Sequence, residues 1–206
     1  MVNSDELRRK GYRHFAKWLD EAERIWNEKR GVKAQRQTLY EWLNYQGKLT
    51  AQKRQHRHLA LYNAAGTNIS ATYLDRTSTQ FPFIVDSKLY WLACDDTSEA
   101  YYLTAILNST CVNAAIKPFQ SMGRMGERDI HKKVLDLPIP RFDTENTGHT
   151  ALASLGEKAH IKTREVLKHA ELPKTIAQRR GVVRDALQDL LERIDETVSD
   201  LMDLDK

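Results

Sequence analysis

Residues 58–94, HLALYNAAGTNISATYLDRTSTQFPFIVDSKLYWLAC, decide the fold. Within this stretch the short segments HLALYNA, NISATYL, FPFIV and KLYWLAC are rich in aromatic and β-branched residues. The segments are separated by polar or glycine-containing turns, a pattern that is typical of β-strands. We therefore expect each segment to form a strand of a mostly antiparallel or mixed sheet.

Helical patterns lie on both sides of the expected strands. Residues 4–30 begin at a capping Ser4, place apolar side chains on roughly one face and end near Gly31, which predicts one long amphipathic helix. Residues 97–119 open with a Thr or Ser cap and continue with helical periodicity, which Asn108 and Ser109 could interrupt. The two prolines of LPIP, residues 137–140, predict extended backbone.

The C-terminal third also reads as helix. Apolar residues recur every three or four positions from Val183 to Leu201, and a similar pattern marks a preceding helix from Leu152 to Val166. Pro173 separates the two patterns. This predicts a helical hairpin, which either packs along its own seam or serves as a spacer that docks on helices of another domain or chain.

Together these patterns predict an α+β fold with a small sheet, a long N-terminal helix and a C-terminal helical hairpin. The expected boundaries are an N-terminal helical segment at 1–50, an α+β domain at 51–143 and the hairpin at 144–206.

Composition limits the class of protein. The 206 residues are 41% hydrophobic and 29% charged, and they contain no run of about 18 apolar residues that could span a membrane. The charged N-terminal residues do not resemble a secretory signal, and there are only two cysteines, Cys94 and Cys111. We therefore expect a cytoplasmic protein in which both cysteines act as small hydrophobic residues rather than metal ligands.

Positive charge is concentrated in two stretches. Residues 32–58 hold six Lys or Arg against one acidic residue, and residues 117–141 hold six against three. Residues 59–116, between them, hold two against five. Such basic clusters are typical of a surface that binds a polyanion, because each neutralised phosphate releases counterions, although they are also found on ordinary solvated faces.

Motifs for catalysis are missing. The sequence lacks GxxxxGK[ST], GxSxG, HExxH and CxxC. Asp86 and Lys88 lack the second acidic residue that nuclease chemistry needs, and Asp95 and Asp96 adjoin a helix start, where capping explains them better than metal binding. We expect no catalytic and no metal-ligating residues.

Three successive segments carry a resemblance to a known family: PFIVDSKLYWLACDD, EAYYLTAILNST and GRMGERDIHKKVLDLPIPRFD. In this order they resemble the C-terminal target-recognition region of adenine-specific DNA methyltransferases and of fused restriction–modification enzymes. They are also similar to the recognition domains of type I specificity subunits. The resemblance covers about residues 58–141.

The resemblance implies a sequence-specific module for double-stranded DNA whose catalytic part lies elsewhere. The active-site motif of the methyltransferase, an Asn or Asp followed by two prolines and an aromatic residue, does not occur here, and neither does its glycine motif for S-adenosylmethionine. The expected partners are therefore DNA and a methyltransferase or restriction domain or subunit. S-adenosylmethionine would belong to that partner, and this chain alone would hold no cofactor.

The loop FQSMGRMGERDIHKK, residues 119–133, supplies the first group of candidate DNA contacts. Its glycines permit positive φ and a close approach to phosphate, Arg124 or Arg128 could read guanine, and its lysines could grip phosphate. In the alternative, Glu127 and Asp129 neutralise the arginines and the glycines only shape a turn. The candidate residues are Gln120, Ser121, Gly123, Arg124, Gly126, Arg128, Lys132 and Lys133.

Two further groups complete the candidate interface. The basic run AQKRQHRH offers Lys53, Arg54 and Arg57 as phosphate contacts that would meet the duplex from the other side. The polar turn around Gly66 offers Asn63, Thr67 and Asn68, whose side chains could pair with adenine edges. In the alternative, these residues are there only because they favour a turn. Two other functions stay open: a nuclease or methyltransferase with an unrecognised site, and a helical module for protein interaction.

Overall fold

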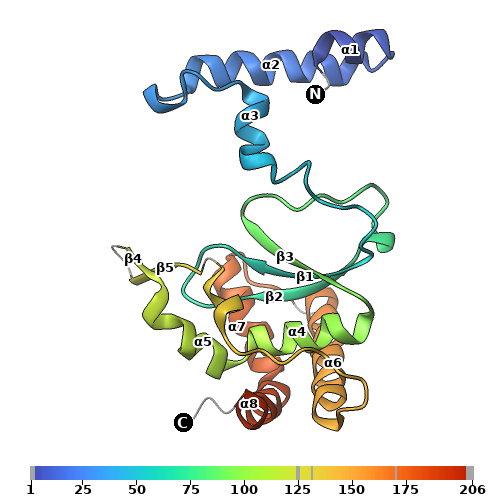
Figure 1. The fold of residues 1–206 in the computed structure, drawn as a ribbon, viewed down its shortest axis with the longest axis vertical. Helices are drawn as coiled ribbons and strands as arrows, with labels where there is room; N and C mark the ends of the chain where they lie inside the picture. Colours follow the sequence, from blue (N-terminus) through green and yellow to red (C-terminus); the bar gives the residue numbers. More distant parts are fainter. Residues whose placement is uncertain (1–2, 124–125, 131, 170, 203–206) are drawn as a thin grey trace. The chain divides into compact units, whose positions relative to one another are not determined.

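The computed structural model describes residues 3–123, 126–130, 132–169 and 171–202. The chain divides into two compact units, Met1–Gln52 and Lys53–Lys206. The first unit is helical, and the second combines a small antiparallel sheet with helices, so the predicted α+β class is confirmed. Figure 1 traces the order of the elements along the chain.

The first unit begins with two helices where the sequence predicted one. Helix α1 (Ser4–Arg9) ends before Gly11, whose φ of +85° turns the chain, and α2 (Arg13–Lys29) begins two residues later. The break lets Leu7 of α1 pack against Leu19 of α2, which a continuous helix would forbid. The predicted cap is also wrong, because the side chain of Asn3, not Ser4, accepts a hydrogen bond from Glu6 N at 2.9 Å.

A short third helix closes the first unit. Helix α3 (Leu39–Leu43) starts with a capping box in which Thr38 and Glu41 bond each other's main chain, and this hydrogen bonding lowers the pKa of Glu41. Leu39 packs with the helices before it, and the rings of Trp26 and Trp42 lie 4.7 Å apart. Two 3₁₀ turns, η1 (Val32–Ala34) and η2 (Tyr45–Gly47), flank α3.

The sheet of the second unit has β1 at its centre. Strand β1 (His58–Asn63) pairs antiparallel with β2 (Ala71–Asp75) on one side and with β3 (Leu89–Cys94) on the other. Three of the four predicted strands are thereby confirmed, but the fourth segment, FPFIV at 81–85, forms no strand. Val85 instead packs on Leu59 and Leu61, so this segment covers one face of the sheet. The 3₁₀ turn η3 (Arg76–Ser78) leads into it.

The other face of the sheet is covered by helix α4 (Thr97–Asn108), as Figure 1 shows. Asp96 caps α4 by accepting from Glu99 N at 2.8 Å, so the cap precedes the predicted Thr or Ser. The predicted interruption is confirmed, because Ser109 ends α4 and caps α5 (Thr110–Ile116) through Val112 N. The chain continues through η4 (Lys117–Phe119), β4 (Ser121–Gly123), β5 (Gly126–Asp129) and η5 (Lys133–Asp136).

The segment LPIP crosses α4 in extended form and belongs to no strand. The Tyr102 hydroxyl donates to Pro140 O at 3.0 Å, and burial raises the pKa of that hydroxyl to about 12. His149 Nδ1 accepts from Asp143 N at 3.0 Å, which fixes the chain just before the next helix.

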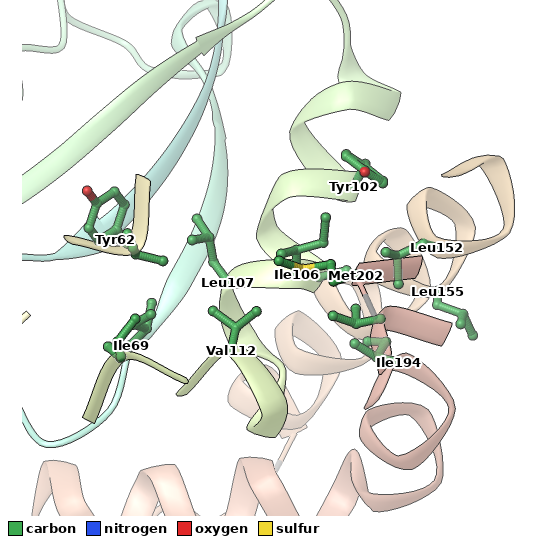
Figure 2. Close-up of a cluster of buried hydrophobic side chains, with 14 of the residues drawn as sticks. Tyr62, Ile69, Tyr102, Ile106, Leu107, Val112, Leu152, Leu155, Ile194 and Met202 are labelled. Atoms are coloured by element: carbon green, nitrogen blue, oxygen red, sulfur yellow. The ribbon is translucent and has the colours of Figure 1, made fainter. Parts of the chain in front are cut away.

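The C-terminal helices complete the core of the second unit. They are α6 (Thr147–His169), α7 (Ile176–Ala186) and α8 (Gln188–Met202), so the predicted stripe from Val183 to Leu201 is divided at Leu187. Figure 2 shows Ile106 of α4 among Leu152 of α6 and Ile194 and Met202 of α8. Helices α6 and α8 therefore pack on α4 as well as on each other, and the three helices share one core.

Two contacts fix the position of these helices. Helix α6 passes so close to α4 that a Cβ at Gly156 would collide with the main-chain oxygen of Tyr101. Asp195 of α8 accepts from Thr110 N at 2.6 Å and from Thr110 Oγ1 at 2.7 Å, which satisfies the first turn of α5. Within the described ranges, no helix is long and apolar enough to cross a membrane.

Candidate nucleic-acid interface

Two predicted groups of contact residues meet at one end of the sheet. Gly66 N donates to Arg128 O at 2.7 Å, Ile130 N donates to Ala64 O at 3.1 Å, and Ala65 forms a β-bridge with Asp129. The turn between β1 and β2 is thus joined to the β4–β5 hairpin, although the two are far apart in sequence. We call residues 63–70, 117–123 and 126–130 the turn–hairpin surface.

Asn63 shapes the turn with its side chain. Its Nδ2 donates to Ala65 O at 2.9 Å and to Asn68 O at 3.1 Å, while its Oδ1 accepts from Ser70 N at 2.7 Å. Gly66 has a φ of +140°, which favours glycine, and a Cβ there would lie 2.9 Å from Asn63 Nδ2. The Asn63 amide is therefore occupied within the turn and is not free to read a base.

Two further asparagines hold the turn from the helical side. Asn108, in the AILNS segment, pairs with both main-chain groups of Ala71: its Oδ1 accepts from Ala71 N and its Nδ2 donates to Ala71 O, each at 2.9 Å. Asn113 Oδ1 accepts from Ile69 N at 2.7 Å in a buried position. Asn108 thus acts like a neighbouring strand where the edge strand β2 begins.

The predicted polar contacts of the hairpin, Gln120 and Ser121, also bond to groups of the protein. Gln120 is buried and donates from Nε2 to Gly66 O at 3.1 Å, while its Oε1 has no hydrogen-bond partner among the described residues. Ser121 Oγ donates to Asp129 Oδ2 at 2.6 Å. Both side chains hold the hairpin together and fix it to the turn.

The two glycines of the hairpin differ. Gly126 has the predicted positive φ, +108°, whereas Gly123 does not adopt one. A Cβ at Gly123 would lie 3.4 Å from Gly126 O and 3.5 Å from Arg128 Cδ, which is ordinary contact, so the structure does not require glycine there. Arg124, which the sequence proposed for base readout, lies outside the described residues.

Arg128 keeps its charge available. Its side chain is exposed, and its guanidinium forms no ion pair or hydrogen bond with any residue that the structure describes. Glu127 instead pairs with Lys117 at 3.7 Å, and Lys117 Nζ also donates to Thr67 O at 2.6 Å. Glu127 therefore pairs with Lys117 rather than with Arg128, while the part of the alternative that concerns Arg124 lies outside the described residues.

The remaining candidates around this end divide into free and paired side chains. Thr67 and Asn68 are exposed, and their side chains have no partner within the described ranges. Lys132, two residues beyond the buried Ile130, is likewise exposed and free of described partners, whereas Lys133 pairs with Asp136 at 3.3 Å.

The basic run at residues 53–57 lies at the opposite end of β1, about 17 Å away along the strand. Arg57 binds Asp75 through Nε at 3.1 Å and Nη2 at 2.8 Å, and this pairing lowers the pKa of the Asp75 carboxyl. Arg76 Nη1 donates to Lys53 O and His56 O, at 2.8 and 3.2 Å. Lys53 and Arg54 remain exposed.

Sequence reasoning missed three residues that position these surfaces: Arg76, Asn108 and Lys117. Burial lowers the pKa of Arg76, whose Nε and Nη2 have no partner among the described residues. Lys117 lies within the basic stretch of residues 117–141, and Asn108 lies within the AILNS segment, but only the structure reveals the main-chain groups that they bind.

No group of three His, Cys, Asp or Glu side chains that could hold a metal ion occurs among the described residues. Comparisons of the chain with protein-family models, with curated proteins and with solved structures found no match.

Proposed function

We propose that this chain binds double-stranded DNA with sequence preference and supplies target recognition to a cytoplasmic DNA methyltransferase or restriction–modification system. The observation that carries the proposal is the turn–hairpin surface, in which two candidate segments are joined by main-chain hydrogen bonds beside an exposed Arg128 that pairs with none of the described residues. A two-stranded ribbon with an arginine is a form that can enter the major groove. The catalytic partner would hold S-adenosylmethionine, and this chain would carry no chemistry of its own.

The contacts of the side chains divide the candidates into three roles. Arg128 is the base reader, since its guanidinium is free to make two hydrogen bonds to guanine, and Asn68 and Thr67 are the polar contacts beside it. Lys132 grips phosphate, with Lys133 as a weaker contact because Asp136 competes for it. Asn63, Gln120 and Ser121 position the surface and do not touch DNA.

The basic run supports a second contact on the same duplex. Lys53 and Arg54 are exposed in the loop before β1, and β1 itself is about 17 Å long, which corresponds to about five base pairs of a duplex lying along it. Arg57 is at most a weak DNA contact, because Asp75 already binds its guanidinium at two nitrogens.

The test begins with selection of a preferred site from randomised duplexes, followed by affinity measurements on preferred and scrambled DNA at one fixed salt concentration. Arg128→Ala should cost about 1 to 3 kcal/mol on the preferred duplex and much less on the scrambled one. Lys132→Ala should weaken both duplexes alike and reduce the salt slope by about one. Equal losses from Arg128→Ala on both duplexes would remove base readout from the hairpin.

Salt dependence tests the electrostatic part separately. Affinity for any duplex should fall steeply between about 50 and 200 mM salt, since each neutralised phosphate releases counterions. A flat or undetectable affinity throughout that range would overturn DNA binding altogether.

The absence of chemistry is tested with the purified chain. Neither labelled methyl transfer from S-adenosylmethionine nor cleavage of plasmid with Mg²⁺ should exceed background. Activity that a single substitution in this chain abolishes would refute the non-catalytic role.

A further inference from the structure

Helix α2 carries a second apolar stripe, most of which its own unit leaves exposed. Ala16 and Leu19 are buried against α1 and α3. Phe15, Trp18 and Ile25 face outward with 52%, 60% and 41% of their surfaces exposed. Together with Ala22 they recur at spacings of three, four and three residues, which is the spacing of a seam between two paired helices.

A hollow interrupts this stripe at its one small residue. Trp18, Ile25 and Trp42 surround Ala22 and enclose about 360 Å³. The lining is almost entirely apolar, with Glu21 at the edge. Such a hollow accepts a bulky apolar side chain, and the stripe that contains it also presents one, because Trp18 is exposed and stacks only on Phe15 at 5.8 Å.

We propose that a second copy of this chain covers this face, with the two α2 helices antiparallel about a twofold axis near Asp20. In that arrangement Phe15 of each copy faces Ile25 of the other, and Trp18 of each copy enters the hollow over Ala22 of the other. The surface is thus complementary to itself, as a twofold interface requires. Parallel pairing would set Trp18 against Trp18 and leave both hollows empty.

The polar side chains beside the stripe fit the same orientation. His14, Glu21 and Glu28 follow the exposed edge of the stripe one heptad apart, so antiparallel copies bring the imidazole of His14, a possible hydrogen-bond donor, to Glu28 of the other chain. The two copies of Glu21 meet at the axis. Arg24 of the same helix pairs with both Glu21 and Glu28, at 2.6 and 2.5 Å, which offsets the repulsion between the carboxylates.

The first test measures mass against concentration for the full chain, by sedimentation equilibrium over about 1 to 100 μM. The wild-type chain should dimerise within this range. Trp18→Glu should weaken dimerisation at least about a hundredfold, because it removes the side chain that fills the hollow and buries a charge in its place. Ala22→Trp, which fills the hollow from within, should do the same.

Val32→Glu is the matched control, since Val32 is 82% exposed in η1 of the same unit and lies off the α2 stripe. It should leave the dissociation constant unchanged, and circular dichroism should show the same helix content in all variants. A wild-type chain that stays monomeric at about 100 μM, or a Val32→Glu effect equal to that of Trp18→Glu, would overturn the proposal.

Orientation is tested with a short thiol cross-linker. A mixture of His14→Cys and Glu28→Cys chains should link faster than either variant alone, with the wild-type chain, which holds buried Cys94 and half-buried Cys111, as background. Faster linking of His14→Cys to itself would show parallel helices and refute the antiparallel arrangement.

Discussion

Residues near both ends of strand β1 were predicted to contact DNA, but the arginines at the two ends have different roles in the structure. At the Asn63 end, amide side chains organise the turn–hairpin surface, and Arg128 is left without a described partner. At the His58 end the arginines themselves organise the structure: Arg57 binds Asp75, and Arg76 holds the main chain of residues 53 and 56.

This difference teaches that a basic residue is available to a partner only where other groups satisfy the local backbone. Asn63 bonds three main-chain groups of the turn and Lys117 bonds a fourth, Thr67 O, so no arginine is needed there. The loop before β1 lacks such an amide, and Arg76 takes its place. Four predictions, made with five substitutions, test the contrast from the largest expected effect to the smallest.

Asn63→Ala should lower the free energy of unfolding by about 2 to 3 kcal/mol, because it leaves three main-chain groups of the turn without their partner. Urea denaturation measures this loss. Asn68→Ala is the control, since the Asn68 side chain has no described partner, and it should cost less than about 0.5 kcal/mol. Similar losses from both would show that the Asn63 amide does not hold the turn.

Arg128→Ala and Arg57→Ala should give opposite results. Loss of Arg128 should reduce affinity for the preferred duplex about tenfold or more and leave the urea midpoint unchanged, because no described residue depends on it. Loss of Arg57 should lower the urea midpoint, since Asp75 loses its partner, with little change in DNA affinity. If both variants show the same pattern, the contrast between the ends does not hold.

Arg76→Met should open the loop before β1 without unfolding the protein. The main-chain oxygens of Lys53 and His56 lose their donor, so cleavage by trypsin after Lys53 and Arg54 should accelerate several-fold. Mapping of the fragments by mass spectrometry measures the rate at these two sites. Arg128→Met, at the other end of β1, should leave the rate unchanged.

The smallest effect concerns pH, and it also lies at the His58 end. His160 of α6 lies against Tyr73 and Tyr101, and burial, assisted by the charge of Arg164, lowers its pKa below the ordinary value of 6.5. The unfolded chain therefore binds a proton more readily than the folded one, and stability falls as pH decreases through 6.5.

His160→Asn removes this proton-linked loss, so the melting temperature of the variant should fall less between about pH 7 and 5.5 than that of the wild-type chain. His56→Asn is the control, because the His56 side chain, in the loop before β1, has no partner among the described residues. A His56 variant that flattens the profile equally would assign the pH dependence elsewhere.

Periodicity was sufficient to predict most of the fold. Alternating aromatic and β-branched residues identified β1, β2 and β3, and three-and-four spacing identified the C-terminal helices. Local reasoning failed where tertiary contacts decided the outcome. The segment at 81–85 has the composition of a strand. It forms none, and Val85 instead packs on Leu59 and Leu61. The long N-terminal helix breaks because Gly11 allows Leu7 to fold back onto Leu19.

The sequence was sufficient to predict which segments form the candidate site, but not the role of each residue within it. Sequence identified the turn around Gly66 and the glycine hairpin, which the structure joins. It could not separate Arg128 from Arg57, because the partner of an arginine is set by residues distant in sequence. Asn63 and Gln120 are residue types that often contact a ligand at a surface, yet both side chains bond to main-chain groups of a tight turn.

The shared core of α4, α6 and α8 has a consequence for synthesis of the protein. Ile106 and Leu107 of α4 leave the ribosome long before Ile194, Val198 and Met202, the residues that bury them. At translation rates of about 5 to 20 residues per second, α4 is synthesised roughly 5 to 20 s before the residues of α8 that pack on it. During that interval the nascent chain, whose three sheet strands all precede α4, presents a hydrophobic helix on the sheet without α8, which is the kind of surface that chaperones hold.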